Sequence, residues 1–199
     1  DPTVNAFALP GGYIYVTRGI MAHLRSEAEL VAVLGHEIGH VTGRHSASQV
    51  SKQQLAMGGL MVGMVVQPEL QRFGGLAQQA LGLLFLKFGR DDENQADELG
   101  LRYMARQDYD PREMLEVFGV LDGVTRAEGG GARMPDWLST HPSPGNRTTR
   151  IQGQIAATGA SGSTVNRREY LRQLDGMVFG DNPREGIVRG RVRDAVGGG

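Results

Sequence analysis

A short run of this chain combines two histidines with a glutamate, in the order His36, Glu37, Ile38, Gly39 and His40. Residues four apart on an α-helix differ by about 40° around its axis, so His36 and His40 leave the same face one turn apart. That spacing suits two adjacent corners of a tetrahedral zinc ion. Glu37 lies on the flank of this face, where its carboxylate can reach a water molecule without binding the metal, as a general base must. The run therefore indicates metal-dependent hydrolysis; an ordinary helix with two surface histidines is the alternative.

A catalytic zinc site usually has three protein ligands, so a third must come from elsewhere in the chain. One candidate is a histidine just downstream, as in the pattern His-Glu-x-x-His-x-x-Gly-x-x-His. That pattern requires the histidine at position 46, where this chain has Ser46, and His45 stands one residue early. If the helix continues through residue 45, His45 points about 140° away from His40. We therefore expect His45 to be a surface or structural residue.

The other candidate for the third ligand is Glu93, within the acidic run of residues 91–98. Asp97 follows Glu93 by one helical turn, so its carboxylate can accept the free ring N–H of a zinc-bound histidine and fix the tautomer of that ring. The alternative is that these acidic side chains only solvate a helix start and favour its dipole.

Small residues flank both halves of this predicted site. Gly39 and Gly43 lie beside the two histidines, and Ala96 and Gly100 lie beside the two carboxylates. Glycine inside a helix costs about 1 kcal/mol relative to alanine, so its presence needs a reason. We expect the two helices to approach closely, because the glutamate is short and a zinc–oxygen bond is only about 2 Å long.

Local signals predict the elements that position these residues. Strand-like residues 5–9 and 13–17 flank a Gly-rich connection, which predicts a β-hairpin. Ser26 with Glu29 forms a capping box that starts a helix at about residue 27, and its apolar face carries the histidines. Further helices are predicted over residues 91–107 and 111–125. Another is predicted to end near Thr158, and a last one runs from a cap at Asn166 to residue 174. The predicted fold class is α+β and predominantly helical.

Two apolar runs, residues 55–66 and 76–88, lie between the two halves of the predicted site. Met57, Met61 and Met64 stand at helical spacing in the first run. We expect two buried core helices that form a hairpin. A mobile Met-rich flap over a substrate groove is the second possibility, since methionine gives adaptable surfaces, and a membrane-surface element is the third. Neither run approaches the roughly 20 residues of a membrane-spanning helix.

Composition excludes several other classes of function. The chain has 199 residues, of which 40% are hydrophobic, enough for one ordinary domain with a sizeable core. Its 21 basic and 22 acidic residues give a net charge of −1, so there is no electrostatic case for binding nucleic acid. The absence of cysteine excludes disulfides and thiolate metal sites. The chain opens at Asp1 without a signal peptide, and we expect a mature or trimmed form.

Taken together, these motifs resemble the gluzincin zinc metallopeptidases that include HtpX and the CAAX prenyl endopeptidases. The resemblance covers residues 5 to about 150 and rests on Asn5-Ala6-Phe7-Ala8 with Gly11-Gly12, His36-Glu37-Ile38-Gly39-His40, Glu93-Asn94-Gln95-Ala96-Asp97 and Thr140-His141-Pro142. Residues 170–176 and 180–181 are similar to the region that follows the peptidase core in the soluble bacterial BepA-like branch. The resemblance implies a zincin-like domain over residues 1–158, followed by a linker, a short helix and a C-terminal arm over residues 159–199.

The same resemblance implies a role for individual residues. His36, His40 and Glu93 would bind one zinc ion per chain, with Glu37 as general base and Asp97 as the partner of a ligand histidine. The hairpin would flank the active-site helix with an edge strand that binds substrate as an added β-strand, through Asn5, Ala6, Phe7 and Ala8.

Two further residues are matched by the resemblance, outside the zinc motif. His141 would lie near the metal, where it either stabilises the developing oxyanion or occupies the fourth zinc position and holds the enzyme inactive. Arg147 would orient the loop after His141 or contact substrate. This chain departs from the usual pattern at Thr148, where an apolar residue is expected.

The predicted function is that of a zinc endopeptidase acting on unfolded or misassembled envelope proteins. One alternative is a zinc-holding, chaperone-like domain that binds unfolded chains and cleaves them little, or a protease latched by His141. Another is a different metal-dependent hydrolase with the same ligands. The resemblance implies a location in the bacterial periplasm or cell envelope, with peripheral association and no membrane-spanning segment.

Overall fold

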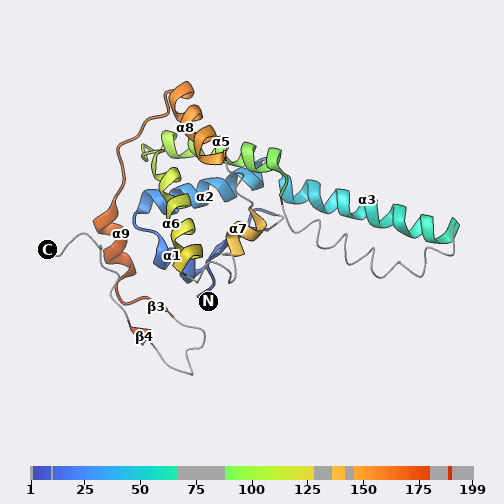
Figure 1. Ribbon diagram of the computed structural model, residues 1–199, viewed down its shortest axis with the longest axis horizontal. Helices are drawn as coiled ribbons and strands as arrows, with labels where there is room; N and C mark the ends of the chain where they lie inside the picture. Colours follow the sequence, from blue (N-terminus) through green and yellow to red (C-terminus); the bar gives the residue numbers. More distant parts are fainter. Residues whose placement is uncertain are drawn as a thin grey trace.

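The computed structural model describes residues 2–9, 11–66, 88–127, 136–141, 146–179 and 188–189. In chain order its elements are β1 (Ala6–Ala8), β2 (Ile14–Val16), α1 (Arg18–His23), α2 (Glu27–Thr42), α3 (His45–Val66), α5 (Arg90–Arg106), α6 (Glu113–Ala127), α7 (Asp136–Thr140), α8 (Arg147–Thr158), α9 (Arg167–Leu174), β3 (Val178–Phe179) and β4 (Val188–Arg189). Helix α2 runs through the middle of the body, and α3 projects away from it (Figure 1). The predicted fold class is confirmed: the protein is a mostly helical α+β structure of the zincin type with a small antiparallel hairpin.

The start of α2 follows the predicted capping signal. The Ser26 hydroxyl oxygen accepts a hydrogen bond from the Glu29 backbone N–H at 3.1 Å. The Glu29 carboxylate accepts from the backbone N–H of Arg25, one residue before the cap. Glu27 and Glu29 also place negative charge in the first turn, which favours the helix dipole. Helix α2 is therefore fixed at the end opposite to its histidines.

Helix α5 packs against α2 with the two backbones in contact. A Cβ added at Gly39 would lie 2.7 Å from the Ala96 carbonyl oxygen, and one added at Gly35 would lie 3.2 Å from the Gly100 Cα. The predicted close approach is confirmed at Gly39, Ala96 and Gly100. Gly43 has a different neighbour, because a Cβ there would meet the ring of His45 instead.

The predicted hairpin is also present. Strand β1 pairs antiparallel with β2, with Ala6 opposite Val16 and Ala8 opposite Ile14. Ala6 is fully buried, and β1 lies against α2. Within the described part of the chain this sheet has two strands, so no third strand is paired with the other edge of β1.

The hydrophobic core joins α2 to the hairpin and to most of the other helices. Helix α6 contributes buried side chains at intervals of three or four residues, which are Met114, Val117, Phe118, Leu121 and Val124. Trp137 of α7, Ile151 of α8 and Tyr170 of α9 belong to the same core cluster. Helices α6 and α9 therefore pack against α2, and α8 packs against α5 and α6. The predicted positions of α6, α8 and α9 are close to those observed, whereas the helix α7 was not predicted.

The predicted cap of α9 is wrong in its detail. Asn166 precedes the helix in the left-handed conformation, with φ 53°, and its side chain makes no capping hydrogen bond. Its amide instead donates to the Glu27 carboxylate at 2.6 Å. Asn166 therefore ties α9 to the first turn of α2, an interaction across the fold that a local pattern does not reveal.

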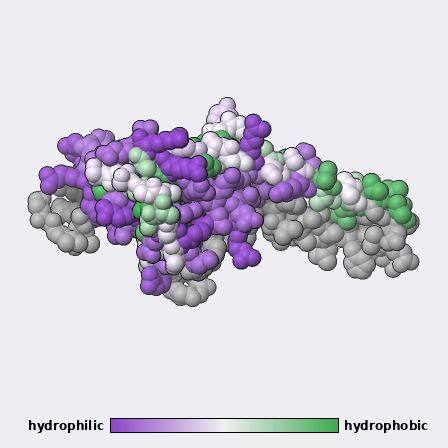
Figure 2. Space-filling view, turned by 90° about the horizontal axis from the view of Figure 1, so that it is seen from above, coloured by the Kyte–Doolittle hydropathy of each residue, from purple (hydrophilic) through white to green (hydrophobic). Residues whose placement is uncertain are grey.

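Residues 55–66 form a helix, but the prediction that they are buried in the core is wrong. Along α3, Leu55 is 82% exposed, Met61 61% and Val65 78%. Figure 2 shows hydrophobic residues on this arm, beside a body that is mostly hydrophilic on the face in view. The chain bends after α2 and carries α3 outward, so these side chains do not reach the core. The second apolar run lies outside the described residues except for its last residue, Phe88. None of the described helices is long and apolar enough to span a membrane.

Replacing Gly39 by alanine tests the contact between α2 and α5. The added methyl group would overlap the Ala96 carbonyl, so we expect Gly39→Ala to lower the free energy of unfolding by about 1–3 kcal/mol. The measurement is chemical denaturation followed by circular dichroism. Gly119→Ala is the matched control, because Gly119 is an exposed helical residue with no atom within 4 Å of the added Cβ. That change should stabilise α6 by up to about 1 kcal/mol. Equal shifts in the two variants would contradict the packing described.

Candidate active site

Four buried side chains from three regions of the chain converge at one point. His36 and His40 come from the last two turns of α2, Glu93 from the first turn of α5, and His141 directly follows α7. Each of the four is at most 2% exposed. One ligand-type atom from each residue lies within 4.8 Å of the other three. The two predicted halves of the metal site therefore meet, and His141 joins them.

The spacing of these atoms fits a tetrahedral metal ion. The Nε2 atoms of His36 and His40 are 3.0 Å apart, and they lie 3.5 and 3.3 Å from the two Glu93 carboxylate oxygens. The Nδ1 atom of His141 lies 2.9 Å from Glu93 Oε1 and 3.3 Å from His36 Nε2. Ligands bound at 2.0–2.1 Å to the corners of a tetrahedron around zinc are about 3.3 Å apart. A donor set of imidazole nitrogens and one carboxylate is also what zinc accepts in proteins that lack cysteine ligands.

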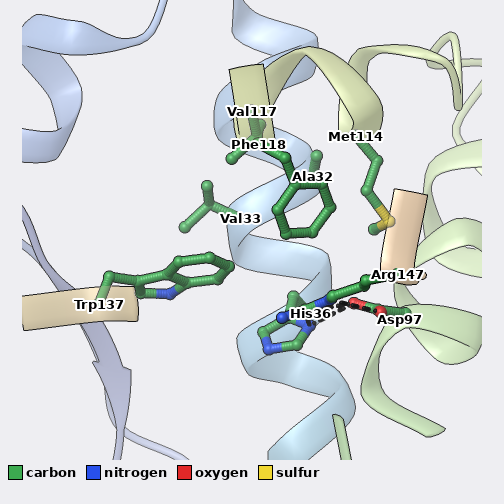
Figure 3. Close-up of a pocket in the computed structure, with 9 residues that line it drawn as sticks. All are labelled: Ala32, Val33, His36, Asp97, Met114, Val117, Phe118, Trp137 and Arg147. Carbon is green, nitrogen blue, oxygen red and sulfur yellow. Dashed lines mark hydrogen bonds and ion pairs between the residues drawn. The ribbon is translucent and has the colours of Figure 1, made fainter. Parts of the chain in front are cut away.

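Asp97 lies where the sequence predicts, beside a ligand histidine. Its Oδ1 atom is 2.9 Å from His36 Nδ1, the ring nitrogen that faces away from the metal position. Arg147 donates two hydrogen bonds to the same carboxylate at 2.7 and 2.8 Å, and Arg150 donates a third at 2.6 Å. Figure 3 shows His36, Asp97 and Arg147 pointing toward one another beneath apolar side chains that include Phe118. The orientation of His36 is thus fixed by a buried and neutralised carboxylate.

The electrostatics of the cluster favour the protonation states that metal ligands need. Burial lowers the pKa of His40 to about 3, and the neighbouring His36 and His141 act in the same direction. Burial acts to raise the pKa of Glu93, but hydrogen bonds with His141 and His40 outweigh it and hold the pKa well below its usual range. The same balance, with His36 and Arg147 as partners, lowers the pKa of Asp97 to about 2. At neutral pH His40 is therefore neutral and both carboxylates are ionised, as metal binding requires.

Glu37 stands beside the ligand cluster without belonging to it. It is 1% exposed, and its Oε1 atom accepts a hydrogen bond from the Trp137 indole N–H at 3.0 Å. The His141 Nε2 atom lies 3.5 Å from the same oxygen. Trp137 was not predicted as a site residue; it is far from Glu37 in sequence, and no local pattern signals the contact. The position of Glu37, next to the metal ligands and held by a fixed donor, suits a general base.

Comparison with known proteins agrees with this geometry. Residues 1–155 match Peptidase family M48. The chain belongs to this family. The mitochondrial metalloendopeptidase OMA1 of Arabidopsis thaliana is 37% identical over 157 residues, which are 77% of this chain and 30% of that protein. The putative beta-barrel assembly-enhancing protease of Vibrio cholerae is 32% identical over 157 residues, 75% of this chain and 32% of that protein.

These relatives limit how finely the chain can be classified. The OMA1 of Schizosaccharomyces pombe is 34% identical over 153 residues, 76% of this chain and 44% of that protein. The predicted metallopeptidase class is confirmed by the family. Mitochondrial and bacterial relatives match alike, so neither the HtpX and CAAX group nor a BepA-like bacterial branch is singled out within M48. The chain also spans less than half the length of these relatives.

Arg147 is buried among the carboxylates of the site. Its Nη1 atom lies 2.9 Å from Glu93, and the guanidinium carbon lies 4.7 Å from the centre of the Phe118 ring. The guanidinium thus contacts Glu93 and Asp97, and its predicted role toward the loop after His141 or toward substrate stays a prediction. Arg150, which the sequence analysis did not assign, shares Asp97 with it.

His141 is held among aromatic rings as well as among the ligands. Its ring stacks on Trp137 at 5.0 Å and on Phe88 at 5.2 Å between centroids. Its backbone N–H donates to the Trp137 carbonyl at 2.8 Å. The structure therefore brings His141 to the ligand cluster, and Phe88 is a further neighbour of the site that the sequence did not indicate.

His45 is a buried structural residue, one of the two roles expected for it, but its ring turns back to His40 because the helix does not continue. Helix α2 ends at Thr42, and the chain turns before α3 begins at His45. His45 is 3% exposed, and its Nδ1 atom lies 3.0 Å from Nδ1 of His40. The prediction assumed a continuous helix, and Gly43 was the signal that it ends.

The predicted substrate strand flanks the site as a partly exposed edge. Phe7 of β1 is 37% exposed and stacks on Tyr15 of β2, with ring centroids 5.2 Å apart. Ala6 points inward against α2, whereas Asn5 bonds through its backbone to Thr17 at the end of the hairpin. Strand β1 contacts α2, the helix that carries His36 and His40, and no described strand pairs with the edge of β1 opposite β2.

Proposed function

We propose that this protein is a zinc-dependent endopeptidase. The observation that carries the proposal is the spacing of His36, His40 and Glu93, whose ligand atoms lie 3.0–3.5 Å apart, with Glu37 close to this group. Membership of Peptidase family M48 agrees with it. His36, His40 and Glu93 are assigned as the zinc ligands, and Glu37 as the general base.

Each residue contributes a defined part of the reaction. A zinc ion bound to these ligands would polarise the scissile carbonyl and lower the pKa of an adjacent water toward about 7. Glu37 accepts the proton of the attacking water and passes it to the departing amine. Trp137, by donating to Glu37 Oε1, leaves the other carboxylate oxygen to handle the proton. Asp97 holds His36 in the tautomer that presents Nε2 to the metal.

The substrate class proposed is an extended polypeptide. The open edge of β1, within the predicted residues Asn5, Ala6, Phe7 and Ala8, would pair with it as an added strand through backbone groups other than those of Asn5, which bond to Thr17. Such main-chain hydrogen bonds bind a peptide without selecting its sequence. Unfolded or misassembled proteins of the cell envelope expose such segments. A periplasmic or envelope location, with peripheral association, belongs to the same proposal; the bacterial relatives are named beta-barrel assembly-enhancing proteases, whereas the OMA1 relatives are named mitochondrial.

Replacing Glu37 by glutamine tests the proposed chemistry. The amide cannot accept the proton, so we expect cleavage of casein or a fluorogenic peptide to fall by about 10²–10⁴-fold. Zinc content should stay at one ion per chain, because Glu37 is not a ligand. A chelator should abolish the wild-type activity.

Glu98→Gln is the matched control for that experiment. Glu98 lies on α5 near the site, but its side chain is 45% exposed and pairs with Arg102. This variant should cleave at the wild-type rate. Near wild-type proteolysis by Glu37→Gln would show that Glu37 is not the general base.

A second candidate function is a latched protease that mainly binds unfolded chains. The specific observation in its favour is that Nδ1 of His141 lies 2.9 Å from Glu93 and 3.3 Å from His36, at the distances of a fourth ligand. A metal ion bound by all four residues has no position left for water or substrate.

His141→Ala separates the latch from an oxyanion-stabilising role. Only the unlatched fraction can act, so a latch that is closed about 90% of the time predicts about tenfold faster cleavage after its removal. The measurement is the initial rate of peptide cleavage at matched zinc occupancy. Slower cleavage would contradict the latch and would indicate that His141 assists the reaction.

A further inference from the structure

The second ligand histidine, His40, has a partner that depends on a sharp turn of the chain. Gly43 ends α2 with φ −72° and ψ −7°, and Arg44 follows with φ 56° in the left-handed region. An arginine rarely adopts this conformation, which costs about 1 kcal/mol or more. The turn brings His45 back over α2 instead of continuing along it.

The ring of His45 is enclosed where this turn places it. Its Nδ1 atom lies 3.0 Å from His40 Nδ1, and its Nε2 atom lies 2.8 Å from Oε1 of Gln95 on α5. A Cβ on residue 43 would come within 2.5 Å of the His45 Nε2 atom, so Gly43 makes room for the ring. Asp92 also lies close to this ring, with its Oδ1 atom 3.9 Å from His45 Nε2. Gly43 in the turn and Gln95 on α5 therefore seat the imidazole of His45 against His40.

The chemistry of the three groups fixes the direction of their hydrogen bonds. When His40 binds a metal through Nε2, its Nδ1 carries the proton and must donate. His45 Nδ1 is then the acceptor, so the proton of neutral His45 is on Nε2. Gln95 presents a carbonyl oxygen to that N–H, and a carbonyl only accepts. The contact of Gln95 with His45 and the contact of His45 with His40 are thus both satisfied by one tautomer of each ring, and in that tautomer the Nε2 atom of His40 is free to bind the metal.

We propose that His45, seated by Gly43 and oriented by Gln95, is a positioning residue that holds His40 with Nε2 toward the metal. This inference rests on the proposed zinc site and adds a residue that acts through a ligand. It gives His40 an uncharged counterpart of the Asp97 carboxylate that holds His36. The two ligand histidines of α2 are therefore each fixed from behind, by different elements of the chain.

The test is the zinc affinity of the purified protein, measured by competition with a chromophoric chelator. His45→Phe keeps a ring of similar size but removes the acceptor, and we expect the dissociation constant for zinc to rise about 10–100-fold. His45→Asn can place its amide oxygen near the position of Nδ1, so it should recover most of the affinity. His23→Phe, on the exposed face of α1, is the matched control and should bind zinc like the wild type.

A double-mutant cycle tests whether Gln95 acts through His45. Gln95→Met removes the carbonyl acceptor at an exposed position, where it should not disturb folding, and should weaken zinc binding less than His45→Phe does. The double variant should bind zinc no more weakly than His45→Phe alone, because both changes break one chain of contacts. Long-range ¹⁵N NMR of the zinc-loaded wild type should show the His45 proton on Nε2.

The outcomes separate this inference from the proposed function. If the wild type binds zinc and His45→Phe has a dissociation constant within threefold of it, the positioning role is overturned. A His45 proton on Nδ1 in the zinc-loaded protein, or strictly additive effects in the cycle, would also overturn it. Zinc binding without any peptide cleavage would overturn the proposed function and leave the positioning role intact. Wild-type protein that binds no zinc would overturn both.

Discussion

The backbone contact between α2 and α5 is the constraint on which the site depends. A glutamate side chain reaches only a short distance, so Glu93 can join His36 and His40 only if its helix nearly touches theirs. The contact of Gly39 with Ala96 meets this requirement, and it leaves no space for even one methyl group. The other elements hold that pair in place: Ser26 fixes the start of α2, and the core residues of α6 support it from behind.

Closing two helices around three histidines and two carboxylates buries charge, which is costly unless each charge is paired. Arg147 offsets the cost of burying these charges, because it pairs with both Glu93 and Asp97 while its guanidinium lies over the Phe118 ring. Arg150 adds a second cation at Asp97. These pairs keep the carboxylates ionised, so the site is prepared for a metal without needing to rearrange. Arg147, which the family resemblance places at the loop or the substrate, also contacts the two carboxylates of the predicted metal site.

Sequence predicted what depends on helical periodicity. The spacing of His36 and His40, of Glu93 and Asp97, and of the small residues beside them determined which side chains share a face, and these meet as expected. It failed where the chain leaves regular geometry. The contact of His45 with His40 was not predicted, because Arg44 adopts the left-handed conformation and turns the chain back. Asn166 bonds to Glu27 instead of to its own helix. The sequence did not indicate that Trp137 and Phe88 lie at the site, because contacts between distant segments depend on the completed fold. The apolar character of α3 predicted burial, but hydropathy does not specify what covers a helix.

The most direct test of this account is the location and identity of the metal. Crystals grown with zinc should show an anomalous peak above the zinc absorption edge that is absent below it. The peak should lie about 2.0–2.1 Å from His36 Nε2, His40 Nε2 and a Glu93 carboxylate oxygen. The absence of an edge-specific peak, or a peak whose ligands exclude Glu93, would contradict the central claim that α2 and α5 close on one zinc ion.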